Sequence, residues 1–362
     1  MRGASESQVR DALESGDPLP GTAGFAGELD GVLVRDVLGR QPIFSEAGDH
    51  TTWSFDHRNL SNPVAVPPGH TRNTNGLEQV WELPNPPAET DREAALEQVK
   101  TAVLESTREV ESEGLAVAFS GGVDSSIVAA GVPDAPCYVA GFEGSHDIDA
   151  ACDAADAMDR DLRVVELTHD ELKRAIPEVV AALGRTNPMD VQIVLPLYLL
   201  AEQVAADGYD KLAVGQGADE LFGGYAKVAK APGDHRVEAE TIRGAAREMI
   251  QTLPDQLERD LLTLRAAGVE PVAPLLDDRV VSAALPLPDE LLVDVEASRR
   301  KVALREASRD VLPESVVEAN KKAVQYGTYA SRELDRLARQ AGYKRRMDNH
   351  VEQYIQSLVG EN

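Results

Sequence analysis

Residues 115–126 read Leu-Ala-Val-Ala-Phe-Ser-Gly-Gly-Val-Asp-Ser-Ser, and the apolar run Ile-Val-Ala-Ala follows at 127–130. An unbroken apolar run of five residues before a glycine turn is typical of a buried strand. The alanine-rich run after the turn favours a helix. The segment therefore predicts a strand, a tight turn and a helix in direct succession.

The turn of this segment has the composition of a phosphate-binding loop. Gly121 and Gly122 let the backbone approach a polyanion, and Ser120, Ser125 and Ser126 carry hydroxyls that can donate to its oxygens. The helix that follows directs its positive end toward the same place. We therefore expect these five residues to bind the phosphates of a nucleotide.

Asp124 is the unusual member of the loop. A carboxylate repels phosphate unless a cation lies between them, so Asp124 predicts a phosphate ligand that carries Mg²⁺. The loop lacks the Gly-x-x-x-x-Gly-Lys-Ser/Thr spacing of the common P-loop. We therefore expect a different chemistry on ATP from cleavage of its β–γ bond.

Strand-like and helix-like segments alternate around this loop. The expected strands are 115–119, 137–142, 162–167 and 211–214, and the expected helices between them are 147–158, 170–183 and 191–206. This alternation is typical of an α/β fold, a parallel sheet with helices on both faces. Ligands of such folds bind at the carboxyl ends of the strands.

A second loop follows the fourth expected strand and reads Gly-Gln-Gly-Ala-Asp-Glu-Leu-Phe-Gly-Gly-Tyr at 215–225. Gly215 and Gly217 permit close approach of the backbone to a ligand. Asp219 and Glu220 place carboxylates at a second strand end. Two acidic residues, one from each loop, can hold one Mg²⁺ against a shared pyrophosphate.

Composition limits the class of protein. The chain has 362 residues and a formal net charge of −26, with acidic residues spread along its whole length. Such a surface disfavours binding of nucleic acid and is typical of halophilic proteins, although an ordinary acidic enzyme has the same sign of charge.

Two cysteines, Cys137 and Cys152, are too few for a disulfide framework. No signal peptide and no apolar stretch of membrane-spanning length are evident, so we expect a cytoplasmic protein that binds no membrane.

The chain is expected to have three parts. Prolines at 84–87 break regular structure before a helical run at 91–111, so a domain boundary is expected there. Residues 1–84 contain short β-like pieces and predict a small, mostly antiparallel domain. Residues 91–330 hold both loops, and residues 331–362 form a charged helical tail within a mostly helical C-terminal part.

The two loops together resemble the synthetase domain of the asparagine synthetase family. The strings Ser-Gly-Gly-Val-Asp-Ser-Ser at 120–126 and Gly-Ala-Asp-Glu-Leu-Phe-Gly-Gly-Tyr at 217–225 carry the resemblance. The segments at 141–145, 196–199, 274–277 and 301–305 follow in the family's order. The resemblance covers about residues 91–330 and implies the adenine nucleotide α-hydrolase-like fold of the ATP pyrophosphatase superfamily.

The resemblance also implies a chemistry, namely attack of a substrate carboxylate on the α-phosphorus of ATP and displacement of AMP by an amine. ATP and Mg²⁺ are then the cofactors, and the resemblance implies that Asp124 and Asp219 are the Mg²⁺ ligands. It also implies that the first loop holds the pyrophosphate and that Gly141 belongs to the nucleotide site. Lys301 is expected to neutralise charge on the α-phosphate. Lys322 is expected near the pyrophosphate, with Lys321 as an equal alternative.

At three positions this sequence has a different residue from the one usual in the family. The second loop of the family usually has a glutamate where Gln216 stands, and an amide cannot accept a proton at neutral pH. Gln216 is nevertheless expected to lie at the catalytic centre. Two family arginines correspond to Val272 and Gln192 here, so aspartate loses its expected cationic partners. We therefore expect a carboxylate substrate whose identity is open.

The N-terminal part resembles the second half of a class II glutamine amidotransferase domain, at 34–42 and 66–70. That domain uses an N-terminal cysteine nucleophile, whereas this chain begins Met-Arg-Gly and has no cysteine before residue 137. Residues 1–84 are therefore expected to be a degenerate remnant without glutaminase activity. Ammonia or another amine is expected from solution or from a separate glutaminase.

The sequence thus predicts an ATP-dependent, AMP-forming amide ligase, which is a carbon–nitrogen ligase of amino-acid metabolism. Two alternatives stay open. One is an adenylating enzyme that acts on a carbonyl oxygen of a nucleobase or metabolite, and the other is a nucleotide-binding regulatory subunit without turnover. A homodimer is compatible with all three hypotheses.

Overall fold

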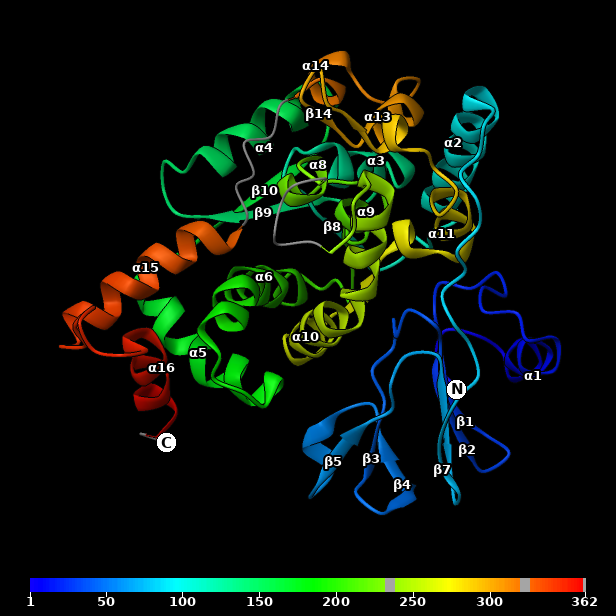
Figure 1. The fold of residues 1–362 in the computed structure, drawn as a ribbon. Coiled ribbons are helices and arrows are strands. Elements are labelled where there is room, and N and C mark those ends of the chain that lie inside the picture. Colours follow the sequence, from blue (N-terminus) through cyan, green and yellow to red (C-terminus); the bar gives the residue numbers. More distant parts are fainter. Residues whose placement is uncertain (232–237, 320–325, 361–362) are drawn as a thin grey trace.

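The computed structural model describes residues 1–231, 238–319 and 326–360 (Figure 1). Its centre is a sheet of five strands in the order β10-β9-β8-β11-β12, and every neighbouring pair is parallel. The strands are β8 (Leu115–Ala118), β9 (Cys137–Gly141), β10 (Leu162–Glu166), β11 (Lys211–Ala213) and β12 (Glu270–Val272). The expected α/β class is confirmed, and the four strands expected from the sequence are present.

Alternate residues of the central strands point to opposite faces of the sheet, as the period of two requires. Val117 and Val139 belong to one buried cluster, whereas Ala116 and Tyr138 belong to another. Helices cover both faces (Figure 1). The first cluster includes residues of α2 (Arg92–Arg108), α3 (Val123–Gly131), α4 (His146–Ala157), α11 (Asp278–Ala284) and α13 (Val302–Ser308). The second includes residues of α5 (His169–Leu183), α6 (Pro188–Ala206), α15 (Tyr326–Gln340) and α16 (His350–Gly360).

The remaining elements of this part lie mostly after the second loop. They are α7 (Ala218–Leu221), α8 (Ala226–Ala229), α9 (Ile242–Gln251), α10 (Leu253–Ala266), η2 (Pro274–Leu276), α12 (Asp289–Leu292), β13 (Val293–Asp294), β14 (Arg299–Arg300) and α14 (Glu314–Val317). The described residues from Tyr225 onward are therefore mainly helical, as expected.

The strand β12 was not expected from the sequence, which indicated only a break near Pro271. This strand is three residues long and pairs with β11 alone, at the edge of the sheet. Proline is tolerated in an edge strand because one side needs no hydrogen-bond donor. Its pairing depends on the position of β11 and not on a local pattern.

The N-terminal part consists mainly of two antiparallel sheets, which confirms the expected class. The strands are β1 (Ala26–Leu29), β2 (Val32–Arg35), β6 (His70–Asn73) and β7 (Gly76–Gln79) in one sheet, and β4 (Asp49–Ser54), β3 (Phe44–Glu46) and β5 (Pro63–Ala65) in the other. The helix α1 (Glu6–Ser15) was not predicted from the sequence, although Ser5 and Gln8 form a capping box at its start. The short η1 (His57–Asn59) completes this part.

Apolar packing joins the N-terminal part to the rest of the chain. Phe25, Leu38 and Trp81 belong to the same buried cluster as Val99 of α2. The irregular segment after β7 is also held, because both terminal nitrogens of Arg247 donate to backbone carbonyl oxygens of residues 83 and 84 at 2.6 Å. The hydrophobic core therefore continues from the β sheets into the helices above them.

The helix α6 has the length and apolar composition of a membrane-spanning segment, contrary to the sequence expectation that no such stretch exists. Half of its apolar window is buried inside the fold. Leu195 and Leu199 pack in the second buried cluster, and the helix contacts α5, α10 and α15. We conclude that α6 is apolar because it is a core helix beneath the sheet.

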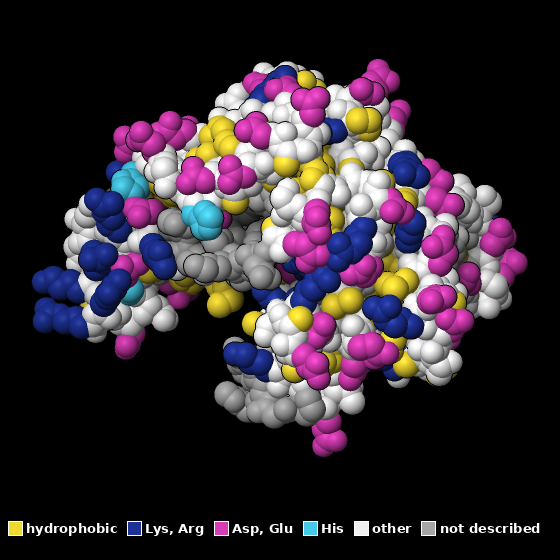
Figure 2. Space-filling view, turned by 90° about the horizontal axis from the view of Figure 1, so that it is seen from above, with side chains coloured by type: hydrophobic (Ala, Val, Ile, Leu, Met, Phe, Trp, Pro, Cys, Tyr) yellow, Lys and Arg dark blue, Asp and Glu magenta, His cyan; other side chains and the backbone are white. Residues whose placement is uncertain are grey.

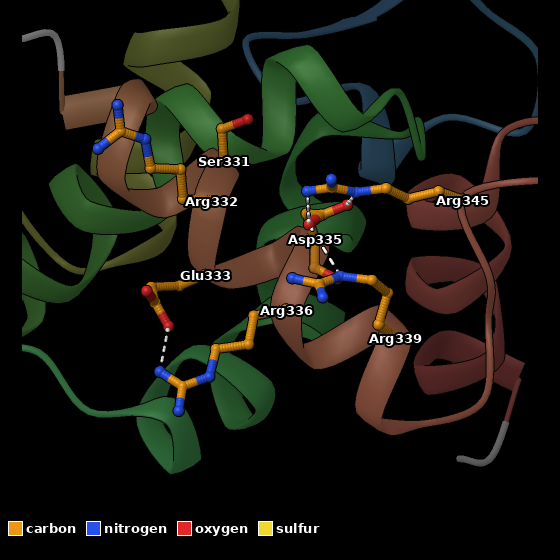
Figure 3. A pocket seen from close by; sticks show the side chains of 7 residues that line it. All are labelled: Ser331, Arg332, Glu333, Asp335, Arg336, Arg339 and Arg345. Carbon is orange, nitrogen blue, oxygen red and sulfur yellow. Dashed lines mark hydrogen bonds and ion pairs between the residues drawn. The ribbon is translucent and has the colours of Figure 1, made fainter.

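Arginine side chains gather on the C-terminal helices, and Figure 3 shows the pocket that they line. Figure 2 shows acidic side chains spread over most of one face, whereas Lys and Arg gather at the edge near α15. Asp335 accepts hydrogen bonds from Arg345 Nη2 at 2.6 Å and from Arg339 Nε at 3.0 Å, and His350 Nε2 lies 2.9 Å away. This carboxylate therefore joins α15 to the turn before α16 and to α16 itself.

We expect Asp335→Asn to loosen α16 and to lower the free energy of unfolding by about 1–2 kcal/mol, because several surface ion pairs are lost together. The hydrogen bond from Arg345, together with His350 and Arg339, lowers the pKa of Asp335. The stabilisation is present above about pH 4 and is lost as the pH falls further. Hydrogen exchange across residues 341–360 measures the effect, with Asp348→Asn as the control, and equal exchange in the two variants would contradict it.

Candidate active site

The first loop connects β8 to α3 at the carboxyl end of the central strand. The φ of Gly121 is +70°, and a Cβ there would lie 2.5 Å from the carbonyl oxygen of Ala150, so this position requires glycine. The backbone N–H of Ser120 donates to Ser125 Oγ at 3.1 Å, and Ser125 Oγ donates to the carbonyl oxygen of Gly122 at 3.2 Å. The loop is therefore closed on itself around the start of α3.

Two polar atoms of this loop are buried without a hydrogen-bond partner, namely Oγ of Ser126 and Oδ1 of Asp124. A buried polar atom without a partner costs about 1–3 kcal/mol. Both residues lie in the first turn of α3, where the helix dipole is positive. The loop therefore has unused hydrogen-bonding capacity at the place where the sequence predicts phosphate.

Lys301 joins the two predicted loops. Its Nζ lies 2.6 Å from Oδ2 of Asp124 and 2.6 Å from Oδ1 of Asp219. The lysine is only 8% exposed and the side chain of Asp124 only 16%, so these two groups form a largely desolvated pair, with Asp219 on its solvent side. The two carboxylates raise the pKa of Lys301 and outweigh the opposite effect of its burial. The ammonium is therefore charged at neutral pH.

The backbone is shaped to bring these groups together. Lys301 has a φ of +58°, a left-handed conformation that is unfavourable for a residue with a side chain, and it caps α13. A Cβ at Gly224 would collide with Asp219 and with the Lys301 side chain. Strain at Lys301 and a required glycine beside it are features of a functional site.

The adjacent acids of the second loop have different environments. The side chain of Asp219 is 46% exposed, whereas Glu220 is buried and accepts a hydrogen bond from the Tyr225 hydroxyl. Burial raises the pKa of Glu220. The structure therefore brings only Asp219 of this pair to Lys301, and Glu220 serves the inner packing of the loop.

The expected Mg²⁺ ligands can be tested against this geometry. Within the described ranges, no cluster of three or more His, Cys, Asp or Glu has the arrangement of a metal site. Mg²⁺ bound to a nucleotide uses only one or two protein carboxylates, together with water and phosphate oxygens. Asp124 has one oxygen on Lys301 and its other oxygen, Oδ1, free of hydrogen bonds, so the pair Asp124 and Asp219 fits such a shared ion.

Gln216 lies between two required glycines of the second loop. A Cβ at Gly215 would be 2.9 Å from Cβ of Asp124, and Gly217 has a φ of +91°. Gln216 Nε2 donates to Oδ2 of Asp260 at 2.5 Å. The residue before Gln216 is therefore adjacent to the first loop, and the partner of Gln216 on α10 was not predicted from the sequence.

Other predicted residues lie farther out or outside the described chain. Gly141 ends β9, where a Cβ would crowd Ser145 Oγ at 2.7 Å, so its role in this structure is close packing of the next turn. Val272 ends β12 and Gln192 lies in the second turn of α6. Lys321 and Lys322 fall outside the described residues.

The fold and the candidate site together define the class of protein. A parallel sheet carries a glycine- and serine-rich loop after its central strand, and a buried lysine holds an aspartate from that loop and another from the loop after the adjacent strand. This is an α/β protein of the kind that binds nucleotides at the carboxyl ends of its strands.

The asparagine synthase family model matches residues 96–242 and 232–358. The chain therefore belongs to the asparagine synthase family, which the sequence motifs indicated. The matched residues include both loops and Lys301.

Relatives are distant. An asparagine synthetase (glutamine-hydrolyzing) 1 of Methanocaldococcus jannaschii is 27% identical over 73% of this chain and 54% of its own length. Asparagine synthetase B (glutamine-hydrolyzing) of Escherichia coli is 27% identical over 55% of this chain and 39% of its own. The chain spans about half the length of the curated relatives it matches. Among solved structures, an NH3-dependent NAD synthetase from Campylobacter jejuni aligns with 76% of this chain and 95% of its own at a TM-score of 0.31 and 12% identity.

Proposed function

We propose that this protein is an AMP-forming amide ligase that activates a carboxylate with ATP and transfers ammonia or another amine to it. The observation that carries the proposal is the cluster of Lys301 with Asp124 and Asp219, at the junction of the two loops. A regulatory subunit without turnover has no need for a strained, buried lysine at this place. The same cluster is the reason to prefer an active enzyme.

The proposed reaction has two steps. The substrate carboxylate attacks the α-phosphorus of ATP, an acyl-adenylate forms and pyrophosphate leaves. The amine nitrogen then bonds to the acyl carbon, AMP leaves with the electrons of the broken C–O bond, and the amine releases one proton. ATP carries Mg²⁺, which when bound neutralises charge on the pyrophosphate.

Protein groups have separate roles in this scheme. Ser126 and the first turn of α3 offer hydrogen-bond donors and a positive dipole to the departing pyrophosphate. Asp124 and Asp219 would hold the metal. Lys301 places a fixed positive charge where negative charge grows in the transition state, an effect that needs no reorganisation when the groups are preorganised.

The substrate proposal follows from the charges near Gln216. Asp260 is paired with Arg259 at 2.7 Å, Arg259 lies 3.6 Å from Asp190, and Asp190 is paired with Arg185 at 2.8 Å. Two arginines and two aspartates cancel, so this network offers no spare cation for a second substrate carboxylate. We propose that the substrate is a carboxylate other than aspartate. We also propose that the amine comes from free ammonium or from a separate protein, and that residues 1–84 have no glutaminase activity. The acidic composition favours a cytoplasm of high salt.

The test is pyrophosphate release in multimolar KCl with Mg-ATP, with a panel of amino acids and other carboxylates, and with ammonium or glutamine as nitrogen donor. We expect release that needs both a carboxylate and ammonium, and none with glutamine as donor. Activity with glutamine would refute the loss of glutaminase. If no carboxylate supports pyrophosphate release, the proposed ligase activity is refuted and a regulatory subunit is favoured. If a nucleobase supports pyrophosphate release, an enzyme that activates a carbonyl oxygen is favoured.

A further inference from the structure

The two edges of the central sheet differ in how they are protected against pairing with another strand. At one edge, β12 bonds to the β11 side through Glu270 N–H, which donates to the carbonyl oxygen of Asp210, and through the carbonyl oxygen of Val272. Pro271 between them therefore faces outward, where it offers no N–H group. The opposite edge is β10, which has five residues and no proline (Figure 1). Only β10 therefore presents a complete strand edge.

The backbone of β10 has hydrogen-bonding groups that point away from the sheet. Cys137 N–H donates to the carbonyl oxygen of Asp161, and Leu167 N–H donates to that of Gly141, both at 2.8 Å. Successive residues of a strand direct their N–H and C=O groups to opposite sides, so the odd-numbered residues face β9. The residues that face outward are Leu162, Val164 and Glu166. Within the described ranges, the N–H and C=O groups of these three residues have no hydrogen-bond partner.

The side chains of β10 leave the middle of this edge open. Val164, the central residue, is 47% exposed although it is apolar and β-branched. The long side chain of Arg163 does not cover the edge, because its guanidinium lies over the rings of Tyr138 and Tyr209. Natural sheets protect an exposed edge with a proline, a bulge or a charge. The middle of β10 has none of these, so it has the features of a strand that pairs with another.

A second copy of the same strand satisfies this edge in one symmetric register. A two-fold axis perpendicular to the sheet makes the two strands antiparallel and places one residue opposite its own copy. If that residue is Val164, Leu162 lies opposite Glu166 of the second copy, and each of these pairs can exchange two hydrogen bonds. All outward-facing residues of β10 are then paired. The two valine side chains meet at the axis, and no like charges lie directly opposite each other.

The surroundings of β10 carry opposite charges at its two ends. Near its carboxyl end lies α15, where Glu333 contacts His169 at 2.5 Å and Arg336 is exposed. Near its amino end lie exposed acids of α4 and of the turn that follows, namely Asp156, Asp159 and Asp161. Antiparallel pairing brings the carboxyl end of one strand toward the amino end of the other. Because each copy supplies both charges, the contact is repeated by the symmetry, which favours a second copy over an unrelated strand.

We propose that two copies of this chain form a dimer through antiparallel pairing of β10 about a two-fold axis at Val164, which joins the two five-stranded sheets into one. The inference does not depend on the proposed ligase activity. Each copy carries a formal net charge of −26, so repulsion opposes the dimer at low salt. In 1 M salt the Debye length is about 3 Å, and the backbone and apolar contacts of the interface remain. We therefore expect the dimer in multimolar KCl.

The test is the mass in solution, measured by light scattering during size-exclusion chromatography in multimolar KCl. We expect the wild-type protein at twice the chain mass of 38.9 kDa. Val164→Pro removes an outward N–H without breaking a bond to β9, so it should weaken the dimer about 100-fold. Val164→Thr keeps the N–H group and the branched shape and should remain dimeric. A wild-type protein of single chain mass, or a dimer unaffected by Val164→Pro, would overturn the proposal.

A cysteine at the proposed axis tests the register. In Val164→Cys combined with Cys152→Ser, the two introduced thiols lie opposite each other, so mild oxidation should give a covalent dimer. Val295→Cys in the same background is the control, because Val295 is 62% exposed but far from β10 in the sequence. Equal crosslinking of the two variants would overturn the assigned axis.

A second variant keeps the mass measurement decisive if the proline variant does not fold, which far-UV circular dichroism shows. Val164→Lys keeps the strand backbone and places two like charges opposite each other at the axis, so it should also give single chains. A folded Val164→Lys variant that is still dimeric would overturn the proposal.

Discussion

Lys301→Met is expected to reduce carboxylate-dependent ATP–pyrophosphate exchange by about 10²- to 10³-fold, the usual cost of removing one preorganised group that stabilises transition-state charge. Lys301 is the cation between Asp124 and Asp219, with 2.6 Å to each. Without it, two carboxylates face each other across a site that must also receive phosphate. The rate of the first step should therefore fall more than the affinity for ATP.

The control for this variant is Arg299→Met, two residues earlier. Arg299 pairs with Glu318 at 3.0 Å and with Glu306 at 3.3 Å, so the change removes a similar charge from the same segment but outside the site. We expect exchange within about twofold of wild type. An equal loss in both variants, or a normal rate in Lys301→Met, would contradict the proposed role of Lys301.

Asp124→Asn distinguishes the metal-binding role from the lysine-binding role. Asp124 Oδ2 holds Lys301, while Oδ1 has no hydrogen-bond partner. If Asp124 binds Mg²⁺ as proposed, the variant should lose pyrophosphate release and need more Mg²⁺ for any residual rate. Lys301→Met should keep the Mg²⁺ requirement of wild type. Unaltered activity of Asp124→Asn would refute the assignment of Asp124 as a ligand.

The sequence predicted the parts of the molecule that depend on local patterns. The strand before the first loop is apolar throughout, and its glycine turn and alanine-rich helix are each recognisable within a few residues of Gly121. The edge strand around Pro271 was missed because it exists only through its pairing with β11. Local composition specifies a strand poorly when tertiary contacts supply its stability.

In the candidate active site, too, local patterns were predictable from the sequence and tertiary contacts were not. Lys301 stands beside Arg299 and Arg300 and has the sequence context of a solvated helix face, yet it is buried. Only the resemblance to a family indicated its place. Asp260 is 44 positions from Gln216, and no spacing relates them, because the contact arises where α10 meets the loop after β11. Arg259 and Asp260 stand in a helix that carries several other charged residues, so the sequence did not distinguish them.

The second large effect concerns the junction between the N-terminal part and the sheet. Arg40 is buried and contacts Asp36 at 2.9 Å and Asp278 of α11 at 2.7 Å. We expect Arg40→Met to lower the free energy of unfolding by about 3–5 kcal/mol, because two buried carboxylates lose their counter-charge. Urea denaturation in the assay salt measures it. Arg58→Met removes an exposed pair with Asp56 and should cost at most about 1 kcal/mol.

The carboxylates left behind explain the size of this effect and give a second test. Changing Asp36 and Asp278 to Asn in the Arg40→Met background removes the uncompensated charges, so the triple variant should be more stable than Arg40→Met alone. Similar stability of the two would show that lost packing of the long arginine side chain is the main cost.

The position of this arginine gives the N-terminal part a structural role next to the candidate site. Arg40 Nη1 donates to the carbonyl oxygen of Leu276 at 2.7 Å, and the Leu276 side chain packs against Gly217 of the second loop. Arg40 thus supports, through one residue, the loop that carries Gln216 and Asp219. We expect Arg40→Met to weaken exchange activity at temperatures where the protein is still folded, whereas Arg58→Met should not. Full exchange activity in folded Arg40→Met would refute this support and leave the N-terminal part a role in stability alone.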